Sequence, residues 1–242
     1  MNNSDYLGAL RRDGQAFATA VTAVDLNARV PSCPDWNVAD LLWHLGEVLY
    51  FWRCIVEQRA TSYEQVVALE RMPDAELVGN YTVQLQRLLE VLGAADPATP
   101  VWTWSDQNDV AFVVRRMAQE TAVHVWDARQ AAGFVEPIDA ELASDGIDEF
   151  LFHFADTRPA AASIVGGSVH IHCTDIGGEW TLMPGSDGSL AVTREHAKGD
   201  CALRGAASDL LLVLWRRVGL DSVDVVGDQG VAARFVAATR LE

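Results

Sequence analysis

Residues 115–129 read RRMAQETAVHVWDAR, and this stretch decides how the first half of the chain folds. Its Ala, Val and Met residues are typical of a helix, and Glu120 and His124 lie four positions apart. Positions i and i+4 share one face of a helix, so the carboxylate and the imidazole fall on the same stripe. Arg116, one turn earlier, extends that stripe. The stretch therefore belongs either to a solvated helix face or to half of a functional site.

Four amphipathic helices are predicted in the first half of the chain. The helix that contains this stretch is expected from about Val110 to Ala132, with Asp109 as its N-cap and Gly133 as its stop. The other three are expected at Asp5–Val24 with Ser4 as N-cap, from Val38 with Asn37 as N-cap, and from Asp74 to a stop at Gly93. The VPSCPDW stretch (30–36), with its two prolines, is expected to be a stiff loop. Apolar residues at helical spacing in four such segments favour a four-helix bundle.

The pattern changes near Glu136 and Pro137. One more helix is expected at Ala140–Phe154, after which the apolar period drops to two. Strands are expected in SVHIHCTD (168–175), GEWTLMPG (178–185), LAVTREH (190–196), CALRG (201–205) and VDVVGD (223–228). Helices are expected in ASDLLLVLWRRV (207–218) and QGVAARFVAATR (229–240). The sequence thus predicts two domains, an all-α domain over 1–136 and an α+β domain over 137–242.

The composition restricts the partners of the chain. The net charge of −16 over 242 residues repels phosphate backbones, so we expect no nucleic-acid partner. No apolar run approaches the ~20 residues that a membrane span needs, and the first residues do not resemble a signal peptide. The cysteines match no zinc-binding pattern; they are Cys33, Cys54, Cys173 and Cys201. We therefore expect a cytoplasmic protein with reduced thiols and no membrane partner.

A metal site is the most specific hypothesis that the spacing supports. His44 lies on the core-facing side of the predicted second helix, and Glu120 and His124 share the inner face of the fourth. Facing helices of bundles often hold metal ions, and two histidines with one glutamate leave a coordination position open. This ligand set suits Zn²⁺, and also Fe²⁺ or Ni²⁺. The alternative is that the three residues are hydrogen-bonded or solvated and bind no metal.

Other side chains have two interpretations each. Arg116 either holds a substrate carboxylate or forms a salt bridge with Glu120. Asp127 either orients a metal-binding histidine or lies on the surface. Trp102 and Trp104 either form the wall of a pocket or pack at a loop.

Two more groups of residues have weaker support. His170 and His172 share a face of a predicted strand, but the sequence shows no third ligand beside them. Cys33 is either a nucleophile, which needs a nearby base, or a small residue that anchors its loop.

The stretch CPDWNVADLLWHLGEV (33–48), together with RRMAQETAVHVWDAR, resembles the mycothiol-dependent maleylpyruvate isomerase family. The matching positions are Cys33, Pro34, Trp36, Asp40, His44, Glu120, His124, Trp126, Asp127 and Ala128. The stretches GEWTL (178–182) and CALRGAASDLLLVLWRR (201–217) are similar to the C-terminal domain of that family. The resemblance implies a DinB-like metal-binding four-helix bundle followed by a sterol-carrier-like α+β domain.

The resemblance also implies a reaction. A divalent metal, most simply zinc, would be held by His44, Glu120 and His124, with mycothiol as the thiol cosubstrate for isomerisation of, or S-transfer to, a small electrophile. It further implies that a basic residue of the second domain enters the active cleft. The candidates are Arg204, Arg216 and Arg217. A thiol-independent zinc hydrolase and a metal- or ligand-binding protein without turnover remain alternatives. The identity of the electrophile stays open, as does the choice between monomer and homodimer.

Overall fold

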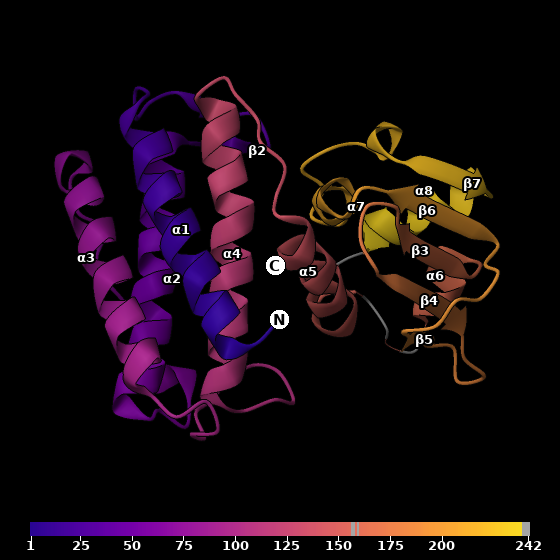
Figure 1. Cartoon of the computed structure of the whole chain (residues 1–242), viewed down its shortest axis with the longest axis horizontal. Coiled ribbons are helices and arrows are strands. Elements are labelled where there is room, and N and C mark those ends of the chain that lie inside the picture. The colour runs from indigo at the N-terminus through magenta and orange to yellow at the C-terminus, as the bar shows by residue number, and fades with distance from the viewer. Residues whose placement is uncertain (156–157, 159, 239–242) are drawn as a thin grey trace. The chain divides into compact units, whose positions relative to one another are not determined.

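The structure is a computed structural model that describes residues 1–155, 158 and 160–238. The chain divides into two compact units, Met1–Glu136 and Pro137–Glu242. The first unit is helical, and the second combines helices with a mixed β-sheet (Figure 1). The predicted fold class, an all-α region followed by an α+β region, is therefore confirmed.

Among the described residues, four long helices lie side by side in the first unit (Figure 1). They are α1 (Asn3–Thr22), α2 (Val38–Gln58), α3 (Asp74–Ala94) and α4 (Val110–Ala131). Helix α1 packs against α3 and α4, and α2 packs against the same two helices. Leu41, Leu45 and Ile55, on the apolar stripe of α2, are fully buried in the bundle. The contact between α2 and α4 is the one that positions the candidate site.

The ends of α2 and α4 follow the predicted capping residues. The Asn37 side chain accepts the Asp40 backbone N–H at 2.9 Å, and the Asp40 carboxylate accepts the Asn37 N–H at 3.1 Å. This capping box fixes where α2 begins, and with it the face that carries His44. Helix α4 is capped by the Asp109 side chain and is followed by Gly133, whose φ of +82° is the left-handed conformation of a helix stop.

Two predicted helix ends of the first unit are wrong. Helix α1 is capped by Asn2 and not by Ser4, because Asn2 forms a capping box with Asp5, three positions on. Leu7 stands three positions after Ser4, so Ser4 has no acidic partner for such a box. Helix α3 continues past Gly93 to Ala94. Its C-cap residue, Ala95, has an extended and not a left-handed backbone conformation.

The segment between α1 and α2 is more ordered than a plain loop. Strands β1 (Arg29–Val30) and β2 (Cys33–Asn37) form an antiparallel pair. Strand β1 contacts α4, and β2 leads directly into α2. The pair thus places the VPSCPDW stretch beside both helices of the candidate site. A short 3₁₀ helix at Tyr63–Gln65 was not predicted either.

The second unit contains a five-stranded sheet in its described residues, with the order β5-β4-β3-β6-β7. The strands are β3 (Val169–Cys173), β4 (Glu179–Pro184), β5 (Leu190–Thr193), β6 (Cys201–Gly205) and β7 (Asp224–Gly227). Strands β3 and β6 run parallel, and the other neighbours are antiparallel. All five lie where the alternating pattern predicted them.

The helices of the second unit are α5 (Ala140–His153), α6 (Ala161–Val165), α7 (Ala207–Leu214) and α8 (Gln229–Ala238). The short helix α6 and a 3₁₀ helix at Leu220–Ser222 were not predicted. Helix α7 ends earlier than position 218, because Arg216 adopts a left-handed φ of 56°. The predicted last helix is present up to Ala238, and positions 239 and 240 lie outside the described residues.

The two faces of β3 differ in character. Val169, Ile171 and Cys173 are buried, and α7 and α8 pack against this strand. Side chains alternate along a strand, so His170 and His172 point to the other face. In the described part of the chain, no helix has the length and apolar content needed to cross a membrane.

Candidate metal centre

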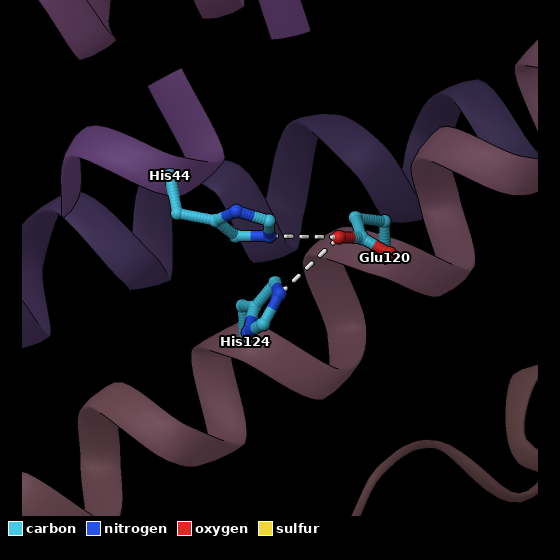
Figure 2. Close-up of side chains that lie close together, drawn as sticks. All are labelled: His44, Glu120 and His124. Atoms are coloured by element: carbon cyan, nitrogen blue, oxygen red, sulfur yellow. Dashed lines mark hydrogen bonds and ion pairs between the residues drawn. The ribbon is translucent and has the colours of Figure 1, made fainter. Parts of the chain in front are cut away.

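Helices α2 and α4 bring the three predicted ligand residues to one point (Figure 2). Nε2 of His44 lies 3.3 Å, and Nε2 of His124 lies 3.2 Å, from the same carboxylate oxygen, Oε1 of Glu120. Each residue offers one possible ligand atom, and these atoms lie within 4.8 Å of one another. We call His44, Glu120 and His124 the bundle cluster. Figure 2 shows both imidazole rings directed at the single carboxylate.

The bundle cluster is buried on one side and open on the other. The His124 side chain is 7% exposed and the Glu120 side chain 19%, whereas the His44 side chain is 33% exposed. Solvent therefore reaches the cluster beside His44, on α2.

A second carboxylate fixes the orientation of the His124 ring through the nitrogen that does not face Glu120. The fully buried Asp127 accepts a hydrogen bond from Nδ1 of His124 at 2.9 Å and one from the Ser32 hydroxyl at 2.6 Å. The alternative of a surface position for Asp127 is therefore wrong. Since Nδ1 is engaged, Nε2 is the nitrogen that faces Glu120. This is the arrangement in which a carboxylate orients a metal-binding imidazole.

Arg116 pairs with the other oxygen of Glu120. Its buried guanidinium donates to Oε2 at 2.6 Å, which is the salt bridge that the i, i+4 spacing suggested. The two oxygens of the Glu120 carboxylate therefore have different partners. Oε2 pairs with the arginine, and Oε1 faces the two histidines.

The pKa values follow from these contacts. Burial alone would raise the pKa of the Glu120 carboxyl, but the Arg116 charge and the hydrogen bonds from both histidines hold that pKa well below its usual range. Burial would lower the pKa of His124, but its bonds to Asp127 and Glu120 outweigh burial and raise the pKa to about 9. The bundle cluster therefore stabilises positive charge. A divalent cation bound between its three side chains would supply such a charge.

Two residues near the cluster were not predicted to contribute to it. The Trp36 ring centroid lies 4.8 Å from that of His44 and 6.3 Å from that of His124, so this indole covers the histidine pair. Ser32 holds Asp127, as described above. Both belong to the VPSCPDW stretch, whose position directly before the His44 helix was the available signal.

The two predicted tryptophans pack near the start of α4. Trp104 is 44% exposed and meets Phe112 edge-on, with ring centroids 5.1 Å apart. Phe112 lies two turns before Glu120 on the same helix. Trp102 stacks on Trp52, with centroids 6.2 Å apart, which is the packing alternative for this residue.

The candidate arginines of the second unit have different surroundings. Arg204 is exposed on β6, where it is the neighbour of His172 on β3. Arg216 donates to the backbone carbonyls of Val236 and Ala237, at 3.1 and 2.9 Å, and so closes the last turn of α8. Arg217 donates to the carbonyl of Trp215. The contacts of Arg216 are those of a residue that secures a helix end.

Comparison with known proteins assigns both halves of the chain. Residues 7–129 match the family described as "Mycothiol maleylpyruvate isomerase N-terminal domain", and residues 141–234 match the "MDMPI C-terminal domain". No curated protein matches the chain.

Two solved structures share the fold. They are crystal structures of the mycothiol-dependent maleylpyruvate isomerase and of a mutant of it, at 12% and 11% identity. Each covers 93% of this chain and 93% of its own, with a TM-score of 0.63. At this identity the likeness concerns the fold, and the family matches carry the assignment. The predicted resemblance is confirmed: the chain belongs to the mycothiol-dependent maleylpyruvate isomerase family of enzymes.

Proposed function

We propose that this protein is a metal- and mycothiol-dependent isomerase of a small electrophile, with the bundle cluster as its metal ligands. The observation that carries the proposal is the convergence of two Nε2 atoms on one carboxylate oxygen, at 3.3 and 3.2 Å. Family membership supports the thiol and the reaction class. The metal and its ligands are our inference from the geometry.

The residues fit a divalent cation. Two imidazole nitrogens and one carboxylate oxygen form a ligand set of catalytic zinc sites, in which a fourth position stays open for water or substrate. The buried Asp127 supplies the outer hydrogen bond that such an imidazole requires. Zinc is the first choice, and Fe²⁺ or Ni²⁺ suit the same donors.

Bound at this point, a divalent cation supplies the positive charge that keeps a thiol deprotonated near neutral pH. The chain's own residues prepare the site for it. Asp127 fixes the His124 ring, Arg116 occupies Oε2 of Glu120, and Oε1 is left to face the histidines. Trp36 covers the rings on one side. A thiolate adds to one carbon of an activated double bond, and the electron pair of that bond moves onto the activating group. The remaining single bond rotates, and the returning electron pair expels the thiolate and restores the double bond in the trans form.

The cysteines of the chain favour a thiol that comes from outside. Cys54, Cys173 and Cys201 are buried, and burial raises the pKa of the Cys173 and Cys201 thiols to about 11. The partly exposed Cys33 has its sulfur 3.9 Å from the Asp127 carboxylate, which already accepts hydrogen bonds from His124 and Ser32. None of these four settings is typical of an activated nucleophile.

The proposal is tested with the purified full chain, zinc, mycothiol and maleylpyruvate as the probe electrophile. Proton NMR follows the cis-to-trans conversion, and calorimetry follows mycothiol binding to the zinc-loaded and metal-free proteins. We expect mycothiol to bind only the zinc-loaded form and conversion to require both. The His124→Ala variant should fail in both assays, and the His153→Ala variant, which lacks a histidine outside the cluster, is its control.

Other outcomes separate the alternatives. A product that retains sulfur indicates S-transfer at the same site. Hydrolysis that proceeds without any thiol would contradict the thiol-dependent mechanism and favour a zinc hydrolase. Zinc-independent binding of mycothiol would contradict the role given to the bundle cluster.

A further inference from the structure

A second group of histidines lies on the sheet of the other unit. His170 and His172 share the face of β3 that points away from α7 and α8. Glu179 on β4 is the cross-strand neighbour of His172, so its side chain lies on the same face. His170, His172 and Glu179 each offer a possible ligand atom, and these atoms lie within 4.8 Å of one another.

A third histidine joins from the segment after β5. Nδ1 of His196 lies 3.0 Å from Oε2 of Glu179, while Oε1 of the same carboxylate contacts Nδ1 of His172. The His196 ring also meets the His170 ring edge-on, with centroids 4.9 Å apart. The backbone beside it is fixed, because the Thr181 hydroxyl donates to the Glu195 carbonyl at 2.7 Å. We call His170, His172, Glu179 and His196 the sheet cluster.

One nitrogen of the sheet cluster is unsatisfied. His170 is 93% buried, and its Nε2 has no hydrogen-bond partner among the described residues. A buried polar nitrogen without a partner is unfavourable and calls for an explanation. A bound cation would provide one, because a neutral imidazole nitrogen is a metal ligand.

We propose that the sheet cluster binds a divalent transition-metal ion, with zinc as its ordinary occupant. Three imidazoles and one carboxylate are the donors that zinc and nickel prefer, whereas magnesium and calcium prefer oxygen donors alone. His170, His172 and Glu179 would supply three protein ligands, which leaves a further position for water or for the nearby His196. The ion can enter from solvent, since the side chains of His172 and His196 are 30% and 72% exposed.

The site would act as a clamp on the open face of the sheet. It joins β3, β4 and the segment after β5, three consecutive parts of the chain whose cluster residues lie between positions 170 and 196. A metal that binds only the folded form stabilises that form by mass action. The role is therefore structural and independent of the reaction proposed for the bundle cluster.

The test uses the full chain carrying His124→Ala, which removes a ligand of the bundle cluster, with Zn²⁺ alone as the probe. Equilibrium dialysis followed by mass spectrometry counts the zinc bound per chain. We expect one zinc per chain in this variant. Adding Glu179→Gln, which keeps the shape of the side chain, should lower zinc affinity by roughly 10- to 100-fold or more, since it removes a ligand and not just its support. Adding His153→Ala instead should change nothing.

A second readout guards against misfolding. In the His124→Ala chain, zinc should shift the ring NMR signals of His170, His172 and His196 and leave that of His153 in place. The exposed His196→Ala variant should weaken zinc binding with unchanged circular dichroism. Absence of bound zinc in the His124→Ala chain, or an unchanged affinity after Glu179→Gln, would overturn the proposal. Because the parent chain is counted in parallel, failure of either cluster is seen separately from failure of the other.

Discussion

The bundle cluster and the sheet cluster consist of the same two types of residue, histidine and glutamate, but their side chains are held in place by different contacts. In the bundle, the central Glu120 is fixed by the buried Arg116, and His124 is fixed by the fully buried Asp127. In the sheet, the central Glu179 is shared by His172 and the exposed His196, and its own side chain is 29% exposed. A site with outer hydrogen bonds keeps its ligands oriented, which catalysis needs. We therefore expect the bundle cluster to keep its ligands in a precise geometry, and the sheet cluster only to hold an ion that links its strands.

The largest effect should come from His124→Ala. This change removes a ligand of the bundle cluster, so we expect zinc affinity at that cluster to fall by more than about 100-fold, beyond the range for outer residues. Thiol-dependent turnover should disappear with it. Calorimetry and a turnover assay measure the two quantities. If His124→Ala has the zinc affinity and the turnover rate of the parent, His124 is not a metal ligand and the bundle cluster is not the catalytic one.

The buried ion pair predicts a large effect on stability. Arg116→Ala leaves the mostly buried Glu120 carboxylate without its guanidinium, so the free energy of unfolding of the metal-free protein should fall by about 3 kcal/mol. Urea unfolding followed by circular dichroism measures this. The matched control is Arg71→Ala, because Arg71 is 43% exposed and the carboxylates that it pairs with, Asp40 and Asp74, are 29% and 54% exposed. The control should cost about 1 kcal/mol or less, and equal losses in both variants would show that burial of the pair is unimportant.

The orienting carboxylate predicts a smaller loss. Asp127→Asn keeps the shape of the side chain but removes its charge, so we expect zinc affinity to fall by about 10- to 100-fold. Ser32→Ala removes only the second hydrogen bond of Asp127 and should have a clearly weaker effect. Zinc titration of both variants gives the ratio. If the two changes weaken zinc equally, the charge of Asp127 contributes nothing beyond the position in which Ser32 holds this side chain.

The smallest effect concerns the start of α2. Asn37→Ala and Asn2→Ala each remove one capping box, and each should lower the free energy of unfolding by about 1 kcal/mol. Of these two capped helices, α1 and α2, only α2 carries a residue of the bundle cluster, so only Asn37→Ala should also weaken zinc binding, by a few-fold. Thermal unfolding and zinc titration of the pair check this. Weakening by Asn2→Ala to the same degree would point to a general loss of stability.

The two clusters also show what a single sequence reveals. Glu120 and His124 lie on one helix, so a local rule, the i, i+4 spacing, places them together. His44 lies on a helix whose start is marked by the Asn37 and Asp40 capping box. Bundle formation then follows from the apolar stripes. The fold and the three residues of the bundle cluster were therefore accessible to local patterns.

The sheet cluster was missed because its contacts are not local. His170 and His172 were visible as a pair, but Glu179 joins them only through the register of β3 and β4, and His196 joins from the segment after β5. A shift of one residue in that register would send Glu179 to the other face. The sequence alone does not fix such a register. Arg216 shows a similar limit, since its bonds to α8 depend on how α7 ends.

The central claim is that the bundle cluster holds a divalent metal, and anomalous diffraction from a zinc-loaded crystal tests it most directly. Data collected on both sides of the zinc absorption edge locate the ion without reference to any ligand assignment. We predict a peak at about 2 Å from Nε2 of His44, Nε2 of His124 and a carboxylate oxygen of Glu120. Zinc that is bound in solution but gives no peak between these three side chains would contradict the account.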